Sequence, residues 1–384
     1  MALINLRNAL MAGRRLPYDA EVEYLQSSGT QWIDTGVNTK QSLKIRAVFE
    51  TDSTISYFAY GVRAGNSTIT CASGTNIETG YVRWGESAFA DAVPRGLVDI
   101  TQYSSGVIVN GTSYQYNAAQ TVVEQSGYTM VIFAGRNSTT NVTANMVGKF
   151  YSCKIWDNGV LVRDFIPVRK GTVGYLYDRV SGKLFGNAGT GDFVLGQDVV
   201  QVEYIESHGT EWIDTGVYAT ENTRVKATLM TISTGNKNWF GGAASGYTGF
   251  AINSYSSTQI EYYFGNGGWK RASGTDLVNR VFTLEFSKSS VSIDGVSVAT
   301  PSYTSFPTQT SPITIFVRYG GTAYINGRVY SFQVYESGDL ARKLLPVRVG
   351  NEGALIDTLT RRVYRNQGTG AFGYGNDLKY PIPA

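Results

Sequence analysis

Val22-Glu-Tyr-Leu-Gln-Ser-Ser-Gly-Thr-Gln-Trp-Ile-Asp-Thr-Gly-Val37 occurs a second time in the chain as Val202-Glu-Tyr-Ile-Glu-Ser-His-Gly-Thr-Glu-Trp-Ile-Asp-Thr-Gly-Val217. The two segments start 180 residues apart and agree at 12 of 16 positions. Toward the far end of each copy, Gly148-Lys-Phe-Tyr-Ser-Cys-Lys-Ile-Trp-Asp-Asn-Gly159 returns as Gly327-Arg-Val-Tyr-Ser-Phe-Gln-Val-Tyr-Glu-Ser-Gly338. Each copy therefore spans about 175 residues, which is too long for a solenoid or propeller repeat and suits a complete domain.

The repeat divides the 384-residue chain into four parts. We expect one domain over residues 21–196 and a second over residues 201–373, joined by a linker too short for independent tumbling. Residues 1–20 precede the first copy and residues 374–384 follow the second, and neither segment belongs to the repeat. Two domains agree with the number expected from the length of the chain.

The composition favours strands over helices. Hydrophobic residues make up 42% of the chain and charged residues only 16%, with 44 glycines and 26 tyrosines, which is typical of short strands joined by tight turns. The segments 42–49 and 223–229 alternate with a period of two. Asn110-Gly111 and Asp294-Gly295 lie between strand-like runs, where a type I′ turn needs positive φ at both residues. We predict an all-β fold of two tandem antiparallel β-sandwich (jelly-roll) domains with a short N-terminal arm.

Charge and the scarcity of reactive side chains exclude several classes of function. The net charge of +3 gives no electrostatic reason to bind nucleic acid or an anionic membrane. The chain has one histidine, His208, and two cysteines, Cys71 and Cys153, so a His/Cys zinc site lacks ligands, and we predict no metal and no cofactor. No stretch reaches the roughly 18 apolar residues of a membrane helix, and the N-terminus lacks a signal-peptide core. We expect synthesis in the cytoplasm.

The repeated segments resemble the concanavalin A-like, laminin-G-like jelly-roll family, in particular a variant found in structural proteins of tailed phages and in surface proteins of gut bacteria. The resemblance rests on the opening Tyr-[Leu/Ile]-x-Ser-x-Gly-Thr-x-Trp-Ile-Asp-Thr-Gly, the Asn-Gly or Asp-Gly hairpin, and the closing Pro-Val-Arg and Asn-x-Gly-Thr-Gly segments. It covers residues 21–196 and 201–373 and implies two stacked, curved antiparallel sheets. It implies less about activity, because such sandwiches serve as lectins, adhesins, glycosidases and architectural modules.

The sequence lacks a suitable set of catalytic residues. A sandwich glycosidase places two carboxylates at alternate positions of one strand, so that both reach the cleft. The strand segments around Glu261 and Glu285 carry single acids. Ser/His/Asp catalysis would depend on His208, whose counterpart in the first copy is Ser28, and a surface-loop histidine is the simpler interpretation. We therefore predict a protein that is not an enzyme.

Sugar binding is a second function that the sequence allows. Trp32 and Trp212, with Asp34 and Asp214, are shared by the copies, which favours a structural role: a tryptophan buried in the core and an aspartate that satisfies backbone groups. A recognition surface is free to differ between copies, so unshared loops are better candidates. The predicted glycan-binding residues are Trp239, Tyr247, Tyr262, Trp269 and Trp84. Because half of the side chains in a sandwich point inward, the alternative that most of them fill the core stays open.

The N-terminal arm carries the prediction about partners. An isolated helix of about 15 residues is marginal in water, so its order would come from another protein. The arm residues predicted to dock are Leu3, Ile4, Leu6, Leu10 and Met11. We predict a virion structural protein of a tailed phage, as a head decoration, fibre or tail appendage, that docks on other virion proteins, forms a homo-oligomer and is assembled in the host bacterial cytoplasm. The alternative is a carbohydrate-binding adhesin module that contacts a bacterial surface glycan.

Overall fold

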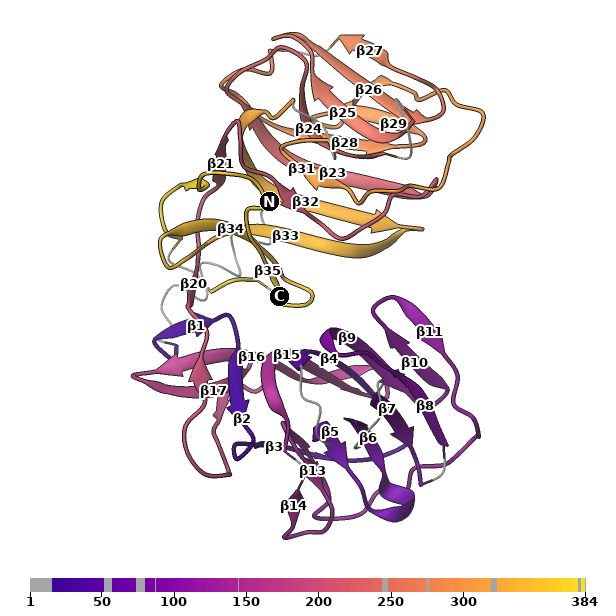
Figure 1. Ribbon diagram of the computed structural model, residues 1–384, viewed down its shortest axis with the longest axis vertical. Helices are drawn as coiled ribbons and strands as arrows, with labels where there is room; N and C mark the ends of the chain where they lie inside the picture. The colour runs from indigo at the N-terminus through magenta and orange to yellow at the C-terminus, as the bar shows by residue number, and fades with distance from the viewer. Residues whose placement is uncertain are drawn as a thin grey trace. The chain divides into compact units, whose positions relative to one another are not determined.

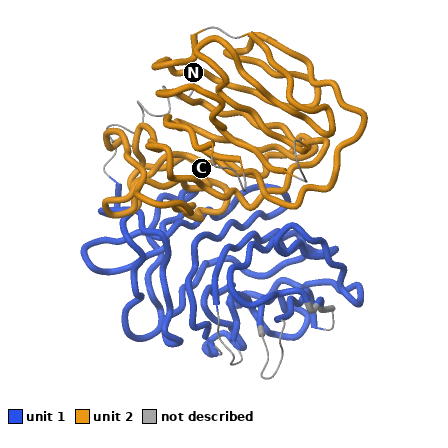
Figure 2. Tube along the Cα trace, turned by 45° about the horizontal axis from the view of Figure 1, so that its top comes forward, with its two compact units in different colours: residues 1–198 blue, residues 199–384 orange. Residues whose placement is uncertain are grey.

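The chain folds into two compact units, residues 1–198 and residues 199–384, which Figure 2 colours separately. The computed structural model describes residues 16–51, 57–73, 80–86, 88–143, 145–243, 248–273, 276–318, 323–378 and 381–383. The arm residues Leu3, Ile4, Leu6, Leu10 and Met11 lie outside these ranges. Docking through the arm therefore stays a prediction.

The first unit is a sandwich of two largely antiparallel sheets. Its larger sheet has the order β11-β10-β9-β4-β15-β16-β17-β18. In addition, β2 pairs with both β15 and β19, and β1 pairs with β16. The bounds are β1 (Ala20–Val22), β2 (Leu25–Ser28), β4 (Leu43–Thr51), β9 (Gly96–Tyr103), β10 (Gly106–Val109), β11 (Thr112–Tyr114), β15 (Val147–Asp157), β16 (Val160–Lys170), β17 (Val173–Asp178), β18 (Lys183–Phe185) and β19 (Val194–Leu195). The smaller sheet has the order β3-β12-β5-β6-β7-β8, with β13 and β14 beside β5. Its strands are β3 (Ile33–Asn38), β5 (Tyr57–Val62), β6 (Ile69–Ser73), β7 (Gly80–Trp84), β8 (Ala88–Val93), β12 (Thr129–Ile132), β13 (Gly135–Arg136) and β14 (Val142–Thr143).

The second unit repeats this architecture. Its larger sheet has the order β30-β29-β28-β23-β32-β33-β34-β35, with β21 and β36 beside β32 and β20 beside β33. The bounds are β20 (Asp198–Gln201), β21 (Ile205–His208), β23 (Thr223–Thr231), β28 (Val281–Ser287), β29 (Ser290–Ile293), β30 (Val296–Ala299), β32 (Asn326–Glu336), β33 (Asp339–Val349), β34 (Glu352–Asp357), β35 (Val363–Tyr364) and β36 (Gly373–Tyr374). The smaller sheet has the order β22-β31-β24-β25-β26-β27. Its strands are β22 (Ile213–Asp214), β24 (Lys237–Ala243), β25 (Gly249–Ser254), β26 (Gln259–Gly265), β27 (Lys270–Ser273) and β31 (Thr314–Ile315).

The all-β jelly-roll prediction is confirmed by this arrangement, which Figure 1 shows strand by strand. In the described part of the chain, the one helical segment is a 3₁₀ turn, η1 (Gly65–Ser67). No described helix has the length and apolar character to cross a membrane. The two predicted hairpin turns are also confirmed, since φ is 49° and 85° at Asn110 and Gly111, and 52° and 82° at Asp294 and Gly295.

Each hydrophobic core lies between the two sheets of its unit, because inward and outward side chains alternate along the strands. In β23 every second residue is buried along the whole strand. In the second core Phe250 lies against Phe286 with ring centroids 4.4 Å apart. Cys71 and Cys153 are free thiols within the first core, where burial raises the pKa of both. They serve as small apolar side chains.

The segment after the second copy continues the repeat, which corrects the expectation that residues 374–384 lie outside it. Strand β36 pairs with β21 as β19 pairs with β2. Arg348 then binds Asp377 through two hydrogen bonds of 2.7 Å each, as Arg169 binds Asp198 at 2.7 and 2.6 Å. The segment that ends the second unit is therefore the counterpart of the linker that ends the first.

Candidate functional site

Three of the five aromatic residues predicted to bind a sugar lie in the hydrophobic cores. Trp84, Trp239 and Tyr262 are 0%, 2% and 5% exposed. The prediction is wrong for these three, because each takes an inward position of its strand and cannot stack on a ligand. Tyr247 lies outside the described residues. Trp269 is half-buried, so part of its ring reaches the surface.

The shared tryptophans lie at the edge of the cores. Trp32 and Trp212 are half-buried rather than fully buried, and Trp212 packs against the second core, as predicted. The cause is the alternation along the strand: the next residue, Ile33 in the first unit, takes the inward position and is fully buried. A β-carbon at Gly189 would lie 2.0 Å from the carbonyl oxygen of Thr30 and 2.9 Å from Cδ1 of Trp32. This close approach explains the glycine of the closing segment.

The shared aspartates satisfy backbone groups, as expected. The N–H of Gly36 donates to Oδ1 of Asp34 at 2.9 Å, and the N–H of Gly216 donates to Oδ1 of Asp214 at 2.7 Å. In the first unit Asp34 also accepts from Nη2 of Arg136 at 2.6 Å, and the Arg136 side chain is 6% exposed. The opening segment is thus a structural element in both units.

A row of polar side chains crosses the outer face of the smaller sheet in the second unit. Asn238 of β24 is paired with Asn253 of β25, Asn253 with Glu261 of β26, and Glu261 with Arg271 of β27. Residues directly opposite each other on neighbouring strands point to the same face of a sheet. Core residues such as Phe250 take the alternate positions, so the row faces away from the core. Figure 1 shows β24, β25, β26 and β27 side by side in this order.

The two asparagines form the buried end of the row. Asn238 and Asn253 are 4% and 3% exposed. Nδ2 of Asn238 donates to the carbonyl oxygen of Ala323 at 3.3 Å, and Nδ2 of Asn253 donates to Oδ1 of Asn236 at 3.2 Å. Neither Oδ1 atom of the pair has a hydrogen-bond partner among the described residues, and both atoms are buried. They are therefore unsatisfied acceptors inside the second unit, which lower its stability.

The other end of the row is aromatic and open to solvent. The Arg271 side chain is 53% exposed, and its Nε donates to Oε1 of Glu261 at 3.2 Å. The same guanidinium lies 3.7 Å from the ring centroid of Tyr255. Trp269 packs edge-on against Tyr263 with ring centroids 4.6 Å apart. A polar floor beside an aromatic rim suits a sugar, which offers hydroxyl groups at its edge and C–H groups on its face.

Tyr263 adds a hydroxyl group and a neighbouring cation to this face. It pairs with Ala251, at the next outward position after the Asn253–Glu261 pair. Burial raises the pKa of Tyr263, and the Arg318 guanidinium, 6.0 Å from the ring centroid, partly opposes the rise. The phenol is therefore neutral at physiological pH.

The positions of the first unit that match Asn238 and Asn253 are apolar. Both β5 and β24 have a bulge, which follows Phe58 in the first and Asn238 in the second. Phe58 is paired with Ala72, and Ala72 with Tyr81. Phe58 and Ala72 are 6% and 0% exposed. The polar row therefore belongs to the second unit.

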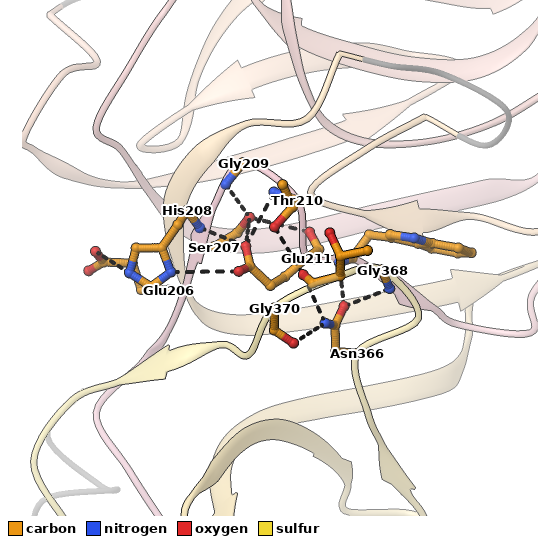
Figure 3. A network of polar contacts seen from close by, with 11 residues as sticks. Glu206, Ser207, His208, Gly209, Thr210, Glu211, Asn366, Gly368 and Gly370 are labelled. Carbon is orange, nitrogen blue, oxygen red and sulfur yellow. Dashed lines mark hydrogen bonds and ion pairs between the residues drawn. The ribbon is translucent and has the colours of Figure 1, made fainter.

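His208, the other candidate for chemistry, forms part of a turn. Its exposed imidazole lies between two carboxylates, with Nε2 3.6 Å from Glu206 and Nδ1 3.7 Å from Glu211, as Figure 3 shows. Burial alone would raise the pKa of Glu211. Hydrogen bonds from the backbone N–H groups of His208 and Thr210 and from the Ser207 hydroxyl outweigh that effect and lower the pKa. The Glu211 carboxylate thus accepts hydrogen bonds that stabilise the turn.

The single strand acids are paired with basic groups. Lys226 lies 2.6 Å and Arg224 3.1 Å from Glu285, and the hydrogen bond from Lys226, helped by Arg224, lowers the pKa of this acid against the effect of burial. Glu261 is paired with Arg271 as described above. Within the described ranges, no group of three or more His, Cys, Asp or Glu side chains is placed to hold a metal ion.

The aromatic pattern in the sequence does not point to the two buried asparagines. A signal was present in the repeat itself. Aligned by their strands, the two copies carry Phe58 against Asn238 and Ala72 against Asn253, and these are the places where an apolar residue is exchanged for an amide. The bulge in each strand has to be known before these residues can be matched.

Comparisons with known proteins find similarity at a low level. No protein-family model matches the sequence, and no curated protein matches it. Among solved structures, the chain is similar to domains LG4-5 of the mouse laminin alpha1 chain, with 12% identity, 97% of each chain covered and a TM-score of 0.31. It is also similar to a "putative carbohydrate binding protein" of Bacteroides ovatus, with 10% identity, 96% of each chain covered and a TM-score of 0.34. Similarity at this level does not extend to a ligand.

Proposed function

We propose that this chain is a non-catalytic carbohydrate-binding protein, and that the outer face of the smaller sheet of its second unit holds the sugar. The ring of the sugar would lie on Trp269, and its hydroxyl groups would reach the guanidinium of Arg271 and the carboxylate of Glu261. The observation that carries the proposal is the solvent-accessible end of the row, where the half-buried Trp269 lies beside the 53% exposed side chain of Arg271.

The arrangement supplies the contributions that sugar binding needs. The aromatic rim offers apolar contact to the C–H face of the ring. Arg271 offers charged donors, and hydrogen bonds to charged groups are stronger than those between neutral groups. Glu261 and Arg271 stand on the paired strands β26 and β27, and the hydrogen bond between them holds both side chains in place before binding, so little ordering entropy is lost.

A glycan array with the intact protein tests this proposal. We expect binding to at least one class of glycan and a loss of about twofold to tenfold in the Trp269→Ala variant, because an aromatic contact contributes about 0.5–1.5 kcal/mol. Trp156→Ala, at a half-buried tryptophan of the first unit, is the matched control and should leave binding unchanged.

Absence of binding to every glycan by the folded, intact protein would contradict the proposal. Equal binding by the Trp269→Ala variant would move the sugar site away from this face. Unfolding curves of both variants show whether each unit is still folded.

The virion role stays a separate prediction. It depends on Leu3, Ile4, Leu6, Leu10 and Met11, which lie outside the described residues. The homo-oligomer, the virion partners and assembly in a bacterial cytoplasm are likewise predictions from the resemblance. A fibre or decoration protein that binds a bacterial surface glycan would combine this role with the proposed one.

A further inference from the structure

We infer that Arg271 makes the sugar site prefer an acidic sugar, one whose ring carries a carboxylate, over the corresponding neutral sugar. The inference rests on the proposed function, since it names the class of ligand for the same site. It follows from the way in which the guanidinium group is held and from the charges around it.

Arg271 and Trp269 belong to the same face of the sheet. Trp269 directly precedes β27 and Arg271 lies within it, and alternate residues of a strand share a face at a spacing of about 6–7 Å. The strand register places Arg271 opposite Glu261. The next outward residue of β26 is Tyr263, against whose ring Trp269 packs. A sugar ring on Trp269 therefore has the side chain of Arg271 as its neighbour along the strand.

Two contacts hold the guanidinium group of Arg271 and leave one of its edges available. Its Nε donates to Oε1 of Glu261 at 3.2 Å, and the group lies 3.7 Å from the ring centroid of Tyr255. Among the described residues, neither Nη atom has a hydrogen-bond or ion-pair partner. The N–H groups on this edge match the two oxygens of a carboxylate, which a guanidinium binds through two parallel hydrogen bonds.

The balance of charge on this face also favours an anion. The Arg271 side chain is 53% exposed, whereas the Glu261 side chain is 9% exposed, so the cation is the part of this ion pair that a ligand meets from solvent. Arg318 lies 6.0 Å from the ring centroid of Tyr263 and adds a second positive charge. Two arginines and one glutamate leave these three side chains with a net positive charge, which attracts a carboxylate and has little effect on a neutral sugar.

A carboxylate therefore gains more from Arg271 than a hydroxyl group does. A hydroxyl group offers one oxygen and no charge, whereas a carboxylate offers two oxygens and a full negative charge. Because the guanidinium group is exposed and its field is screened by salt, we expect a modest preference for the acid, about fivefold.

The experiment uses pairs of sugars that differ only at C6, where one member carries CH2OH and the other a carboxylate: glucose and glucuronate, galactose and galacturonate, mannose and mannuronate. Each sugar is presented on the same neutral polymer, and binding to the full chain is measured by titration at pH 7 and at several salt concentrations. We expect the acid member of the bound pair to bind about fivefold more tightly at physiological salt, and the ratio to shrink as the salt concentration rises.

Three variants assign the preference to a residue. Arg271→Gln should abolish it, because an amide carries no charge, whereas Glu261→Gln should increase it, because the guanidinium then has no competing carboxylate. Arg83→Gln is the matched control. Arg83 lies 5.1 Å from the ring centroid of Tyr81 in the first unit, so this variant removes the same charge at a second arginine–tyrosine contact and should leave the preference unchanged.

Stronger or equal binding of the neutral member by the unchanged chain would overturn the inference and leave the proposed function standing. A preference for the acid that survives in a folded Arg271→Gln variant, or that is lost in Arg318→Gln alone, would overturn the assignment to Arg271. Absence of binding to every sugar, neutral or acidic, would overturn the proposed function itself. Thermal unfolding of each variant shows that the substituted unit is intact.

Discussion

At matched positions of the smaller sheet, the first unit holds Phe58 and Ala72 where the second unit holds Asn238 and Asn253. The core-facing side of the same strands is apolar in both units. In the first unit the Phe58 ring covers the backbone at Gly135, where a β-carbon would lie 2.6 Å from it. The outer face is therefore a place where the copies could diverge without disturbing either core.

A second difference concerns one arginine. Phe133 and Phe316 are equivalent, since both have the unusual positive φ of 71° and 72°. The arginine follows three residues later in the first unit, as Arg136, and two residues later in the second, as Arg318. A shift of one residue turns an extended side chain to the other side. Arg136 binds Asp34 at 2.6 Å, whereas Arg318 lies over the Tyr263 ring.

The largest expected effect is the difference in stability between a core substitution and an outer-face substitution in the second unit. Trp239→Ala should destabilise this unit by about 3–5 kcal/mol, because it empties a buried aromatic position. Trp269→Ala, at the rim of the sugar site, should change the unfolding free energy much less and weaken sugar binding. Denaturant unfolding and glycan titration of both variants measure the contrast. A stable Trp239→Ala variant that had lost sugar binding would reverse these assignments.

For Trp84, Trp239 and Tyr262, the sequence alone did not predict which face of the sheet each side chain takes. The repeat and the Asn110-Gly111 turn predict the sandwich and its hairpins, because turn chemistry and alternation are local. Which face a strand residue takes depends on bulges, which alternation alone does not reveal. The bulge after Asn238 turns Trp239 and Phe240, adjacent in sequence, both into the core.

Exchanging outer-face residues between the smaller sheets of the two units tests how the buried amides affect stability. The double variant Asn238→Phe with Asn253→Ala gives the second unit the residues of the first. We expect stability to stay equal or rise by about 1 kcal/mol, because two buried acceptors that have no partner among the described residues are removed, and sugar binding at Trp269 to change little. Titration and unfolding of the same preparation test both expectations.

The reverse exchange is the control. Phe58→Asn with Ala72→Asn should destabilise the first unit, since it buries amides where no partner is prepared, and should leave sugar binding in the second unit unchanged. Loss of binding in this control would show that the first unit takes part in the site.

The shared aspartates should differ in importance between the units. Asp34→Ala leaves the buried guanidinium of Arg136 without its carboxylate, whereas Asp214→Ala removes a hydrogen bond from Gly216. Because the Asp34 side chain is itself 39% exposed, we expect a moderate loss, about 1–3 kcal/mol, in the first unit and less than about 1 kcal/mol in the second. Unfolding curves of the two single variants make the comparison. Equal losses would show that Arg136 finds other partners.

The smallest expected effect lies in the turn that opens each domain. Glu211 of the second unit takes the place of Gln31 in the first, and each accepts from a serine hydroxyl, at 3.1 Å from Ser207 and 3.0 Å from Ser27. The pKa of Glu211 is lowered in the folded state, so its ionised form contributes stability above the pKa of the unfolded chain, about 4.3. This contribution is lost as the pH falls through the lower folded value. Gln31 is neutral, so its contribution to stability does not change with pH in this range.

Glu211→Gln should therefore change the unfolding free energy of the second unit little at pH 7 and make it less sensitive to acid, by about 1 kcal/mol or less between pH 5 and pH 3. The reciprocal change, Gln31→Glu, should give the first unit the acid sensitivity that the second has lost. Denaturant titrations at several pH values measure both slopes. If the slopes of the wild-type and Glu211→Gln chains coincide, the acid sensitivity of the second unit comes from other carboxylates, and the difference between Gln31 and Glu211 has no consequence for stability.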